Sequence, residues 1–302
     1  MIYVFLPLSW LPFFVLHGLS DVLYFLIFYI FRYRRQVVHE NISRAFPDKS
    51  DEWVHGVERQ FYKNFCDVMV ETIKTTSLAP AELAARCKFV GRENANQMTQ
   101  GKNIAALSSH LANWEWLGLS TSMEIKQTPC VIYKPLKNQK MNNFMLKTRS
   151  RFGLVLIAMK DLKRFFEQTH EKPYLLGFLS DQAPHDYAKA FSVPFLNQQT
   201  YYFTGPGVIT VKHNLFPIWG WMRRVGRSRF EWGMDEVIPD ESYVLTKADL
   251  EQIGRVAKLQ NLTEQESEKA FRIVREYSRL LEEKIKAAPA DWLWSHRRWK
   301  AR

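Results

Sequence analysis

The chain has 302 residues, of which 46% are hydrophobic and 14% aromatic. This composition excludes an intrinsically disordered protein, because disordered chains lack the apolar side chains of a packed core. The formal charge of +11 favours an anionic partner, such as nucleic acid, anionic lipid or an acidic carrier protein. Cys66, Cys87 and Cys130 lie far apart in the sequence. Their spacing argues against a disulfide framework or a zinc knuckle and fits a reducing compartment.

The N-terminal segment, residues 2–31, is almost wholly apolar and long enough to cross a bilayer core of about 30 Å. Asp21 interrupts it and would be costly at the centre of a membrane. A basic cluster follows at Arg32, Arg34 and Arg35, which should stay cytoplasmic. We expect an anchor helix that spans the membrane, in preference to a helix or hairpin in the interface or a buried soluble helix.

After this segment the sequence predicts helices that alternate with short strands. An amphipathic helix is expected over residues 51–77, with Glu71 as a solvated carboxylate near its end. Thr263 and Glu266 form a capping box before a helix over residues 264–287. Strands are expected at residues 89–90, 104–107, 130–133, 154–158 and 174–179, and an antiparallel pair at 216–222 and 229–238. This order predicts an α/β fold with a mixed, mostly parallel sheet wrapped by helices.

His110 and Glu115 follow the strand predicted at residues 103–107. Residues five positions apart lie about 140° apart on a helix, so the two side chains meet only across a bend. The change from this strand to a helix over residues 112–123 supplies such a bend. An imidazole at a strand end, oriented by a carboxylate, is a suitable general base for a hydroxyl. The structural alternative is a chance neighbourhood of two common residues.

Three further clusters have a functional interpretation beside a structural one. Lys134 and Arg149 would hold phosphate or belong to a solvated basic region. Asp181 follows another predicted strand and would line the site or cap a turn. Arg297 and Arg298 stand among tryptophans, a pattern that suits a membrane interface and also nucleic acid.

Taken together, these motifs resemble the lysophospholipid acyltransferase superfamily and, within it, the bacterial lipid A late acyltransferases. The similarity covers nearly the whole chain. It rests on the apolar start followed by arginines, the Ala-Phe-Pro at residues 45–47, the His-x4-Glu motif at 110–115, the Tyr-Lys-Pro block at 133–138 with Arg149, the Asp-Gln pair at 181–182, the segments 193–195 and 204–206, and the Trp-rich ending at 289–300.

The chain departs from the family pattern at a few positions. Lys134 replaces the more frequent arginine, and Ala183 stands where many members have a second acidic residue. Residues 195–197 differ from the usual aromatic pair and glycine, and residues 241–262 look like additional length. These departures concern the binding of donor and acceptor rather than the chemistry of acyl transfer.

The resemblance implies a glycerol-phosphate-acyltransferase-like fold, with a membrane anchor over residues 1–31 and a catalytic domain over residues 32–302. It also implies that His110 deprotonates an acceptor hydroxyl, with Glu115 orienting the imidazole. No serine or cysteine nucleophile is placed beside this pair, so we expect direct transfer rather than an acyl-enzyme. No cofactor or metal is expected.

By the same resemblance, the donor is acyl-carrier protein or acyl-CoA and the acceptor is a hydroxyl of a lipid A precursor. The expected location is the bacterial inner membrane, with the catalytic domain on the cytoplasmic side. Backbone N–H groups near the start of the helix, or Asn113, are expected to stabilise the oxyanion, and Lys134, Arg149, Arg297 and Arg298 to contact phosphate. Asp181 is expected to contact substrate.

Two alternatives remain open at this point. An acyltransferase of the same superfamily would act on a lysophospholipid or an aminolipid instead. A membrane-anchored binding protein would use the same features without catalysis, including the binding of nucleic acid. The sequence contains no nucleic-acid-binding motif, which argues against that last possibility.

Overall fold

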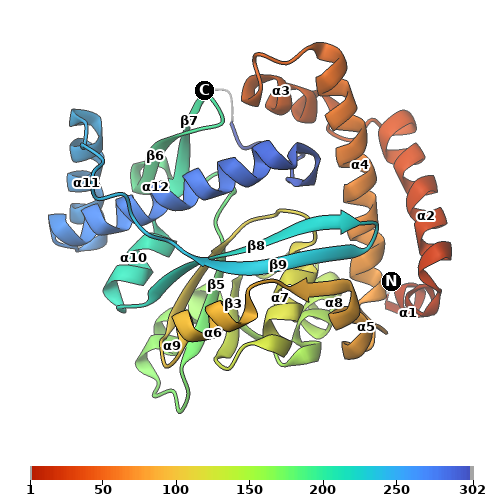
Figure 1. Ribbon diagram of the computed structural model, residues 1–302, viewed down its shortest axis with the longest axis horizontal. Helices are drawn as coiled ribbons and strands as arrows, with labels where there is room; N and C mark the ends of the chain where they lie inside the picture. The colour runs from red at the N-terminus through yellow and green to blue at the C-terminus, as the bar shows by residue number, and fades with distance from the viewer. Residues whose placement is uncertain (1, 300–302) are drawn as a thin grey trace.

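The computed structural model describes residues 2–299 and has helices on both sides of a seven-stranded sheet (Figure 1). The strands lie in the order β1 (Cys87–Phe89), β9 (Arg229–Glu236), β8 (Phe216–Gly226), β2 (Ile104–Ser108), β5 (Tyr174–Leu179), β3 (Thr128–Tyr133) and β4 (Val155–Ala158). All neighbouring pairs are parallel except β8 and β9, which form an antiparallel hairpin. The predicted α/β fold with a mixed, mostly parallel sheet is therefore confirmed.

Strand β2 lies inside the sheet and is buried along its whole length. Successive side chains of a strand point to opposite faces, and β2 contributes to two separate cores accordingly. Ala105 and Leu107 pack into the core that includes α12 (Glu264–Ala287), whereas Ile104 and Ala106 pack into the core that includes α7 (Trp114–Glu124). This explains why β2 reads as a continuous apolar run rather than an alternating one.

Shorter elements complete the two layers of helices (Figure 1). They are α5 (Pro80–Arg86), α6 (Arg92–Thr99), α8 (Gln139–Arg149), α9 (Leu162–Glu167), α10 (Gly205–Lys212), α11 (Lys247–Gln260) and the single turns η2 (Ser150–Phe152), η3 (Met159–Asp161), η4 (Tyr187–Lys189) and η5 (Pro289–Asp291). The capping box of Thr263 and Glu266 is confirmed at the start of α12. The sequence did not predict the separate hairpin of β6 (Ala190–Phe195) and β7 (Gln198–Phe203), or α11 within the additional length.

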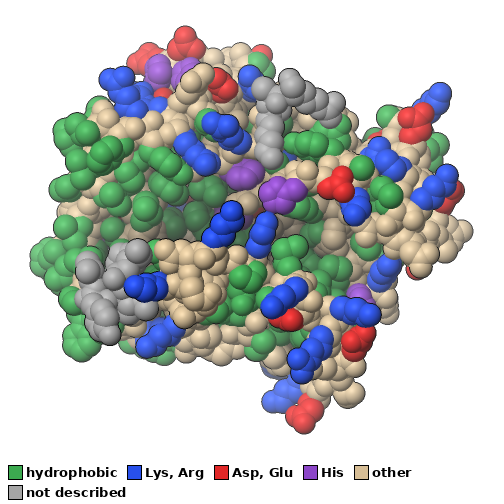
Figure 2. Space-filling view, turned by 180° about the vertical axis from the view of Figure 1, so that it is seen from behind, with side chains coloured by type: hydrophobic (Ala, Val, Ile, Leu, Met, Phe, Trp, Pro, Cys, Tyr) green, Lys and Arg blue, Asp and Glu red, His purple; other side chains and the backbone are tan. Residues whose placement is uncertain are grey.

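The N-terminal elements are α1 (Ile2–Trp10), α2 (Phe13–Phe25), the π-helical turn η1 (Leu26–Ile30), α3 (Arg35–Ala45) and α4 (Asp51–Lys74). Residues Phe13–Ile30 form a helical stretch that is long and apolar enough to cross a membrane. Figure 1 shows α2 beside α4 along much of its length, with α3 near the N-terminal end of α4. Hydrophobic side chains cover this edge of the molecule in Figure 2. A possible N-terminal anchor helix is thus present.

Three polar side chains of α2, those of His17, Ser20 and Asp21, are bonded to other parts of the protein, although Asp21 is also exposed. Ser20 donates a hydrogen bond to Asp67 of α4 at 2.7 Å, and His17 lies 2.8 Å from the hydroxyl of Ser228. Asp21 is bound by Arg227 in the turn between β8 and β9 at 2.7 Å. The carboxylate that seemed costly in a membrane span therefore has a cationic partner in the domain.

Candidate active site

The turn after β2 is held in a sparsely populated backbone conformation. Ala112 has a φ of 52°, in the left-handed region that residues with a β carbon rarely adopt. Its backbone N–H donates to the carbonyl oxygen of Asp291 at 2.9 Å, and the neighbouring Leu111 forms a β-bridge with Trp292. The C-terminal segment therefore fixes the shape of the turn that carries His110. As predicted, this turn lies between a strand and a helix.

Asp181 binds the imidazole of His110. Its Oδ1 lies 2.7 Å from Nδ1 of His110, and its Oδ2 accepts the backbone N–H of His110 at 2.9 Å. Trp292 donates its indole N–H to Oδ2, also at 2.9 Å. Since β2 and β5 are parallel neighbours, their C-terminal ends place His110 and Asp181 together.

The structure corrects the expected role of Glu115. Its two oxygens accept hydrogen bonds from Nε and Nη2 of Arg149, at 2.8 and 2.7 Å. Glu115 lies in the first turn of α7 and Arg149 is the last residue of α8, so this pair joins two helices. Asp181, which we expected to contact substrate, occupies the position on His110 that we assigned to Glu115.

Burial and hydrogen bonding both act on the Asp181 carboxylate, which is 3% exposed. Burial alone would raise its pKa, but the charge of His110 and the hydrogen bonds from His110 and Trp292 outweigh burial and hold the pKa at about 2. Asp181 is consequently ionised at neutral pH and favours the tautomer of a neutral His110 that carries its proton on Nδ1. In that tautomer the lone pair of the imidazole is on Nε2.

The prediction that Asn113 contacts substrate is also corrected, because Asn113 is fully buried. Its side-chain oxygen caps α7 by accepting the N–H of Trp116, and its amide donates to Glu71 at 2.7 Å. Glu71 is itself buried rather than solvated, and it accepts a second bond from Ser228. Burial raises the pKa of Glu71 against the effect of nearby Arg224 and these hydrogen bonds. The two residues form part of the scaffold behind the turn.

The three remaining candidate cations have different surroundings. Arg298 is 3% exposed, donates to the carbonyl oxygen of Tyr201 at 2.6 Å and lies over the ring of Tyr202. Arg298 thereby attaches the C-terminal segment to β7, whereas its Nε and Nη2 atoms are buried without a hydrogen-bond partner among residues 2–299, and its phosphate contact stays a prediction. Lys134 and Arg297 are exposed, so their phosphate contacts stay predictions. Lys300, part of the same C-terminal motif, lies outside the described residues.

Sequence reasoning gave no role to two polar side chains next to this centre. The amide nitrogen of Gln182 lies 3.4 Å from Nε2 of His110. His296 is partly buried, and burial lowers its pKa to about 4, against the opposing charge of Asp181. His296 is therefore neutral near pH 7. The Asp-Gln pair in the sequence was the available signal for Gln182.

A narrow apolar cavity of about 80 Å³ lies against the same end of the sheet. Ser108 and Trp114, which flank His110 in the sequence, both line it, and the ring of Trp114 lies 5.2 Å from that of His110. Cys130 lines its wall, and burial raises the pKa of this thiol to about 11. Figure 2 shows histidine side chains with Lys and Arg side chains beside a hollow that has hydrophobic walls. The arrangement combines an oriented base with space for an apolar group.

A family model described as bacterial lipid A biosynthesis acyltransferase matches residues 1–301 of the chain. The chain therefore belongs to this family, and the resemblance deduced from its motifs is confirmed. No curated protein matches the chain. Membership of an acyltransferase family whose acceptors are of the lipid A type agrees with a base beside an apolar cavity.

Proposed function

We propose that the protein transfers a fatty acyl chain from an acyl thioester to a hydroxyl of a lipid A precursor, with His110 as the general base. The observation that carries this proposal is the buried hydrogen bond between His110 and Asp181, next to an apolar cavity. Acyl-carrier protein is the proposed donor. No observation favours a lysophospholipid acceptor or a silent binding protein, and the experiment below distinguishes both.

In the proposed reaction, Nε2 of His110 removes the proton of the acceptor hydroxyl as its oxygen attacks the thioester carbonyl carbon. The carbon–sulfur bond then breaks, and the imidazolium returns the proton to the departing thiolate. Asp181 holds Nδ1 and stabilises the charged imidazole between these steps. The raised pKa of the cavity thiol, Cys130, supports direct transfer, because only a thiolate would be an effective nucleophile.

The cavity beside His110 is the proposed site of the acyl chain. Three glycines, Gly118, Gly177 and Gly220, line it, and a β carbon at each would lie within 3.4 Å of a neighbouring atom. At about 80 Å³ it holds only a few carbon atoms, since a cavity of about 150 Å³ binds benzene. A long chain therefore requires its lining side chains to move apart.

A small substitution tests the acyl site. A β carbon added at Gly118 would lie 3.3 Å from the Cδ2 atom of Leu154, which narrows the cavity. We expect Gly118→Ala to favour donors with shorter acyl chains, measured by the mass of the lipid product with mixed donors. Gly254→Ala is the matched control. Gly254 lies in α11, away from the cavity, and the nearest atom to its added β carbon would be 3.9 Å away in α12. An unchanged chain-length preference in Gly118→Ala would place the acyl group elsewhere.

The outer surface of α1, α2 and η1 is the proposed membrane contact. Trp10 and Phe14 are 74% and 77% exposed, whereas Ser20 and Asp21 face α4 and the β8–β9 turn. If α2 crossed the membrane, the bonded pair of Arg227 and Asp67 beside it would also enter the bilayer. Charged groups in the bilayer have a high free-energy cost. We therefore favour a helix that lies in the interface over the spanning anchor expected from sequence.

The basic balance of the chain supports the proposed partners and location. A charge of +11 attracts acidic acyl-carrier protein, the phosphates of the acceptor and anionic lipid to one membrane surface. Arg149, Lys134 and Arg297 are the proposed phosphate contacts. The proposed location is the cytoplasmic side of the inner membrane, and the division into residues 1–31 and 32–302 remains part of this proposal.

The decisive experiment complements bacteria that lack the gene with wild type, His110→Ala or His213→Ala. His213 stacks on Phe166 and is a matched control for the loss of an imidazole. Extracted lipid A is weighed by mass spectrometry, and the amount of each variant in the membrane is measured. We expect one additional acyl mass with wild type and His213→Ala, and none with an equally abundant His110→Ala.

The other outcomes are equally informative. If another lipid gains the acyl chain, the superfamily is right and the proposed acceptor is wrong. If no lipid changes with wild type, a binding role replaces catalysis. If His110→Ala is as active as wild type, the His110–Asp181 pair is structural and the mechanism fails.

A further inference from the structure

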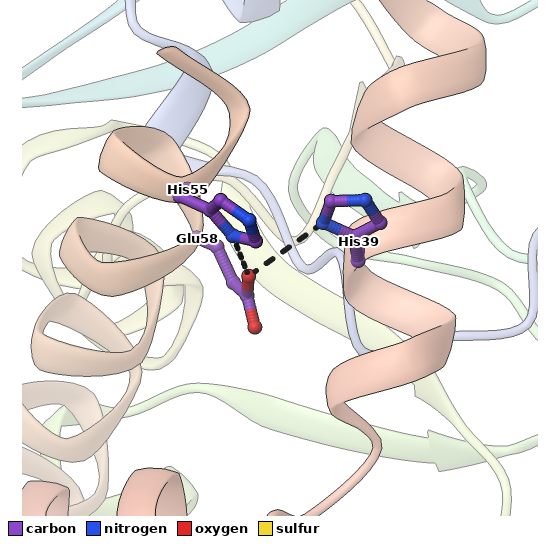
Figure 3. A group of neighbouring side chains, drawn as sticks. All are labelled: His39, His55 and Glu58. Carbon is purple, nitrogen blue, oxygen red and sulfur yellow. Dashed lines mark hydrogen bonds and ion pairs between the residues drawn. The ribbon is translucent and has the colours of Figure 1, made fainter. Parts of the chain in front are cut away.

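A second cluster of metal-ligating side chains lies between α3 and α4, apart from the site described above. His39 belongs to α3, and His55 and Glu58 belong to α4. One nitrogen or oxygen atom from each of the three lies within 4.8 Å of the other two. Figure 3 shows both imidazole rings beside the Glu58 carboxylate, one from each helix.

The Glu58 carboxylate divides its two oxygens between different partners. Its Oε1 accepts a hydrogen bond from Arg35 at 2.9 Å. Its Oε2 lies 3.2 Å from Nδ1 of His55 and 3.8 Å from Nδ1 of His39. Glu58 is 1% exposed, and Arg35 fixes its Oε1 while Oε2 is hydrogen-bonded to Nδ1 of His55. A cation bound by Oε2 and both imidazoles would replace the proton shared in that hydrogen bond.

The position of His39 points to a missing ligand. Its Nδ1 atom is buried, yet it has no hydrogen-bond partner among residues 2–299. The 3.8 Å to Oε2 is too long for a hydrogen bond. Tetrahedral Zn²⁺ with bonds of about 2.0–2.1 Å separates neighbouring ligand atoms by roughly 3.3 Å. The observed separations of 3.2 and 3.8 Å bracket this value.

The surroundings leave room for an ion and a further ligand. The cluster borders a hollow of about 370 Å³, which Asp51 also lines. Asp51 lies one turn before His55 on α4, so residues 51, 55 and 58 share one face of that helix. Asp51 is outside the group of mutually close ligand atoms, and its charge offsets that of Arg32, which lines the same hollow.

The geometry points to a binding site for a divalent transition-metal cation of the zinc class, held by His39, His55 and Glu58. Two imidazoles and one carboxylate are ligands that suit Zn²⁺. The site joins α3 to α4. Asn41 of α3 donates to the carbonyl oxygens of Trp294 and His296, so the cation also stabilises the contact between α3 and the C-terminal segment. This inference is independent of the proposed function.

The test uses the full chain, purified in detergent without a histidine tag and treated with a chelator. Zinc binding is measured by equilibrium dialysis, and Zn²⁺-dependent changes in the melting temperature are measured in parallel. We expect one equivalent bound to wild type and a rise in its melting temperature. His55→Ala, an exposed position, should weaken binding at least tenfold, because one of three protein ligands is lost.

His39→Ala should weaken binding to a similar extent, and His213→Ala should bind as wild type does. Binding that is equal in wild type and the His39→Ala, His55→Ala double variant would overturn the assignment. Absence of saturable binding to a wild type that still shows a cooperative melting transition would overturn it too. Both readouts are independent of acyl transfer, so the outcome does not depend on the activity of the protein.

Discussion

Asp181 and Glu115 are both carboxylates near the turn that carries His110, yet their surroundings differ. The side chain of Asp181 is 2% exposed and accepts hydrogen bonds from the ring and backbone of His110 and from Trp292. Glu115 accepts two bonds from one guanidinium, that of Arg149, which is 29% exposed. Donors from several elements hold Asp181 in one orientation, whereas the orientation of Glu115 depends on a single partner side chain. The comparison shows that the carboxylate bonded to His110 is the one distant in sequence, and Asp181 is therefore the one we propose to orient the imidazole.

The largest effect is expected for Asp181→Asn. The amide keeps the shape of the side chain but removes the negative charge that favours Nδ1–H and the imidazolium form of His110. We expect the kcat of acyl transfer to fall about 10³-fold, within the range of general-base effects. Turnover of acyl-carrier-protein thioester by the purified variant measures it. A rate within threefold of wild type would show that Asp181 is not needed for proton transfer, and the proposed mechanism would be wrong on this point.

The second prediction concerns pH. Because Asp181 has a pKa of about 2 in the folded protein, below its usual value of 3.8, it binds protons more weakly when folded. Its contribution to stability is complete above about pH 4 and is lost as the pH falls through 2; it amounts to about 2 kcal/mol. Urea unfolding over this range should show the loss in wild type and Glu115→Gln. Asp181→Asn should lack it, and an identical pH dependence in all three would contradict the assignment.

A smaller effect is expected for Glu115→Gln, which leaves His110 and Asp181 intact but releases Arg149. If Arg149 binds an acceptor phosphate as proposed, the KM for the acceptor should rise about tenfold, equivalent to about 1.4 kcal/mol, with little change in kcat. Steady-state kinetics with varied acceptor separates the two constants. A loss of kcat as large as that of Asp181→Asn would indicate that Glu115 takes part in proton transfer. The proposed difference in role between the two carboxylates would then be wrong.

The smallest effect is expected for Trp292→Phe, which removes one of the hydrogen bonds to Asp181. A single such bond contributes about 0.5–1.5 kcal/mol, so kcat should fall roughly three- to tenfold. The melting temperature separates this effect from unfolding. Trp299→Phe, which removes an indole bond to Thr200 instead, is the matched control and should keep kcat.

The sequence was most informative where structure depends on local pattern. The apolar run before His110 predicted a buried strand, the following pattern predicted a helix, and His110 does lie in the turn between them. The same local reasoning identified the capping box at Thr263 and Glu266. These features follow from propensity, periodicity and hydrogen bonds between residues a few positions apart.

The partner of His110 could not be deduced in this way. Asp181 is 71 positions away, and it reaches His110 only because β5 lies next to β2 in the sheet. Periodicity predicts strands but not their order, so the sequence alone favours the nearer carboxylate, Glu115. Burial of Asn113 and Arg298 has the same origin, since each is covered by a segment distant in sequence: Asn113 by Glu71 and Arg298 by Tyr201.

The position of β2 between β5 and β8 has a consequence for motion. A strand with paired neighbours on both sides and buried residues on both faces opens to solvent only when the sheet itself comes apart. Its amide hydrogens should be among the slowest in the protein to exchange with deuterated water. His110 lies two residues beyond the end of this strand, so the proposed base is attached to a part of the chain that should open slowly. Fluctuations that move the exposed side of α2 should therefore leave the His110–Asp181 pair in place.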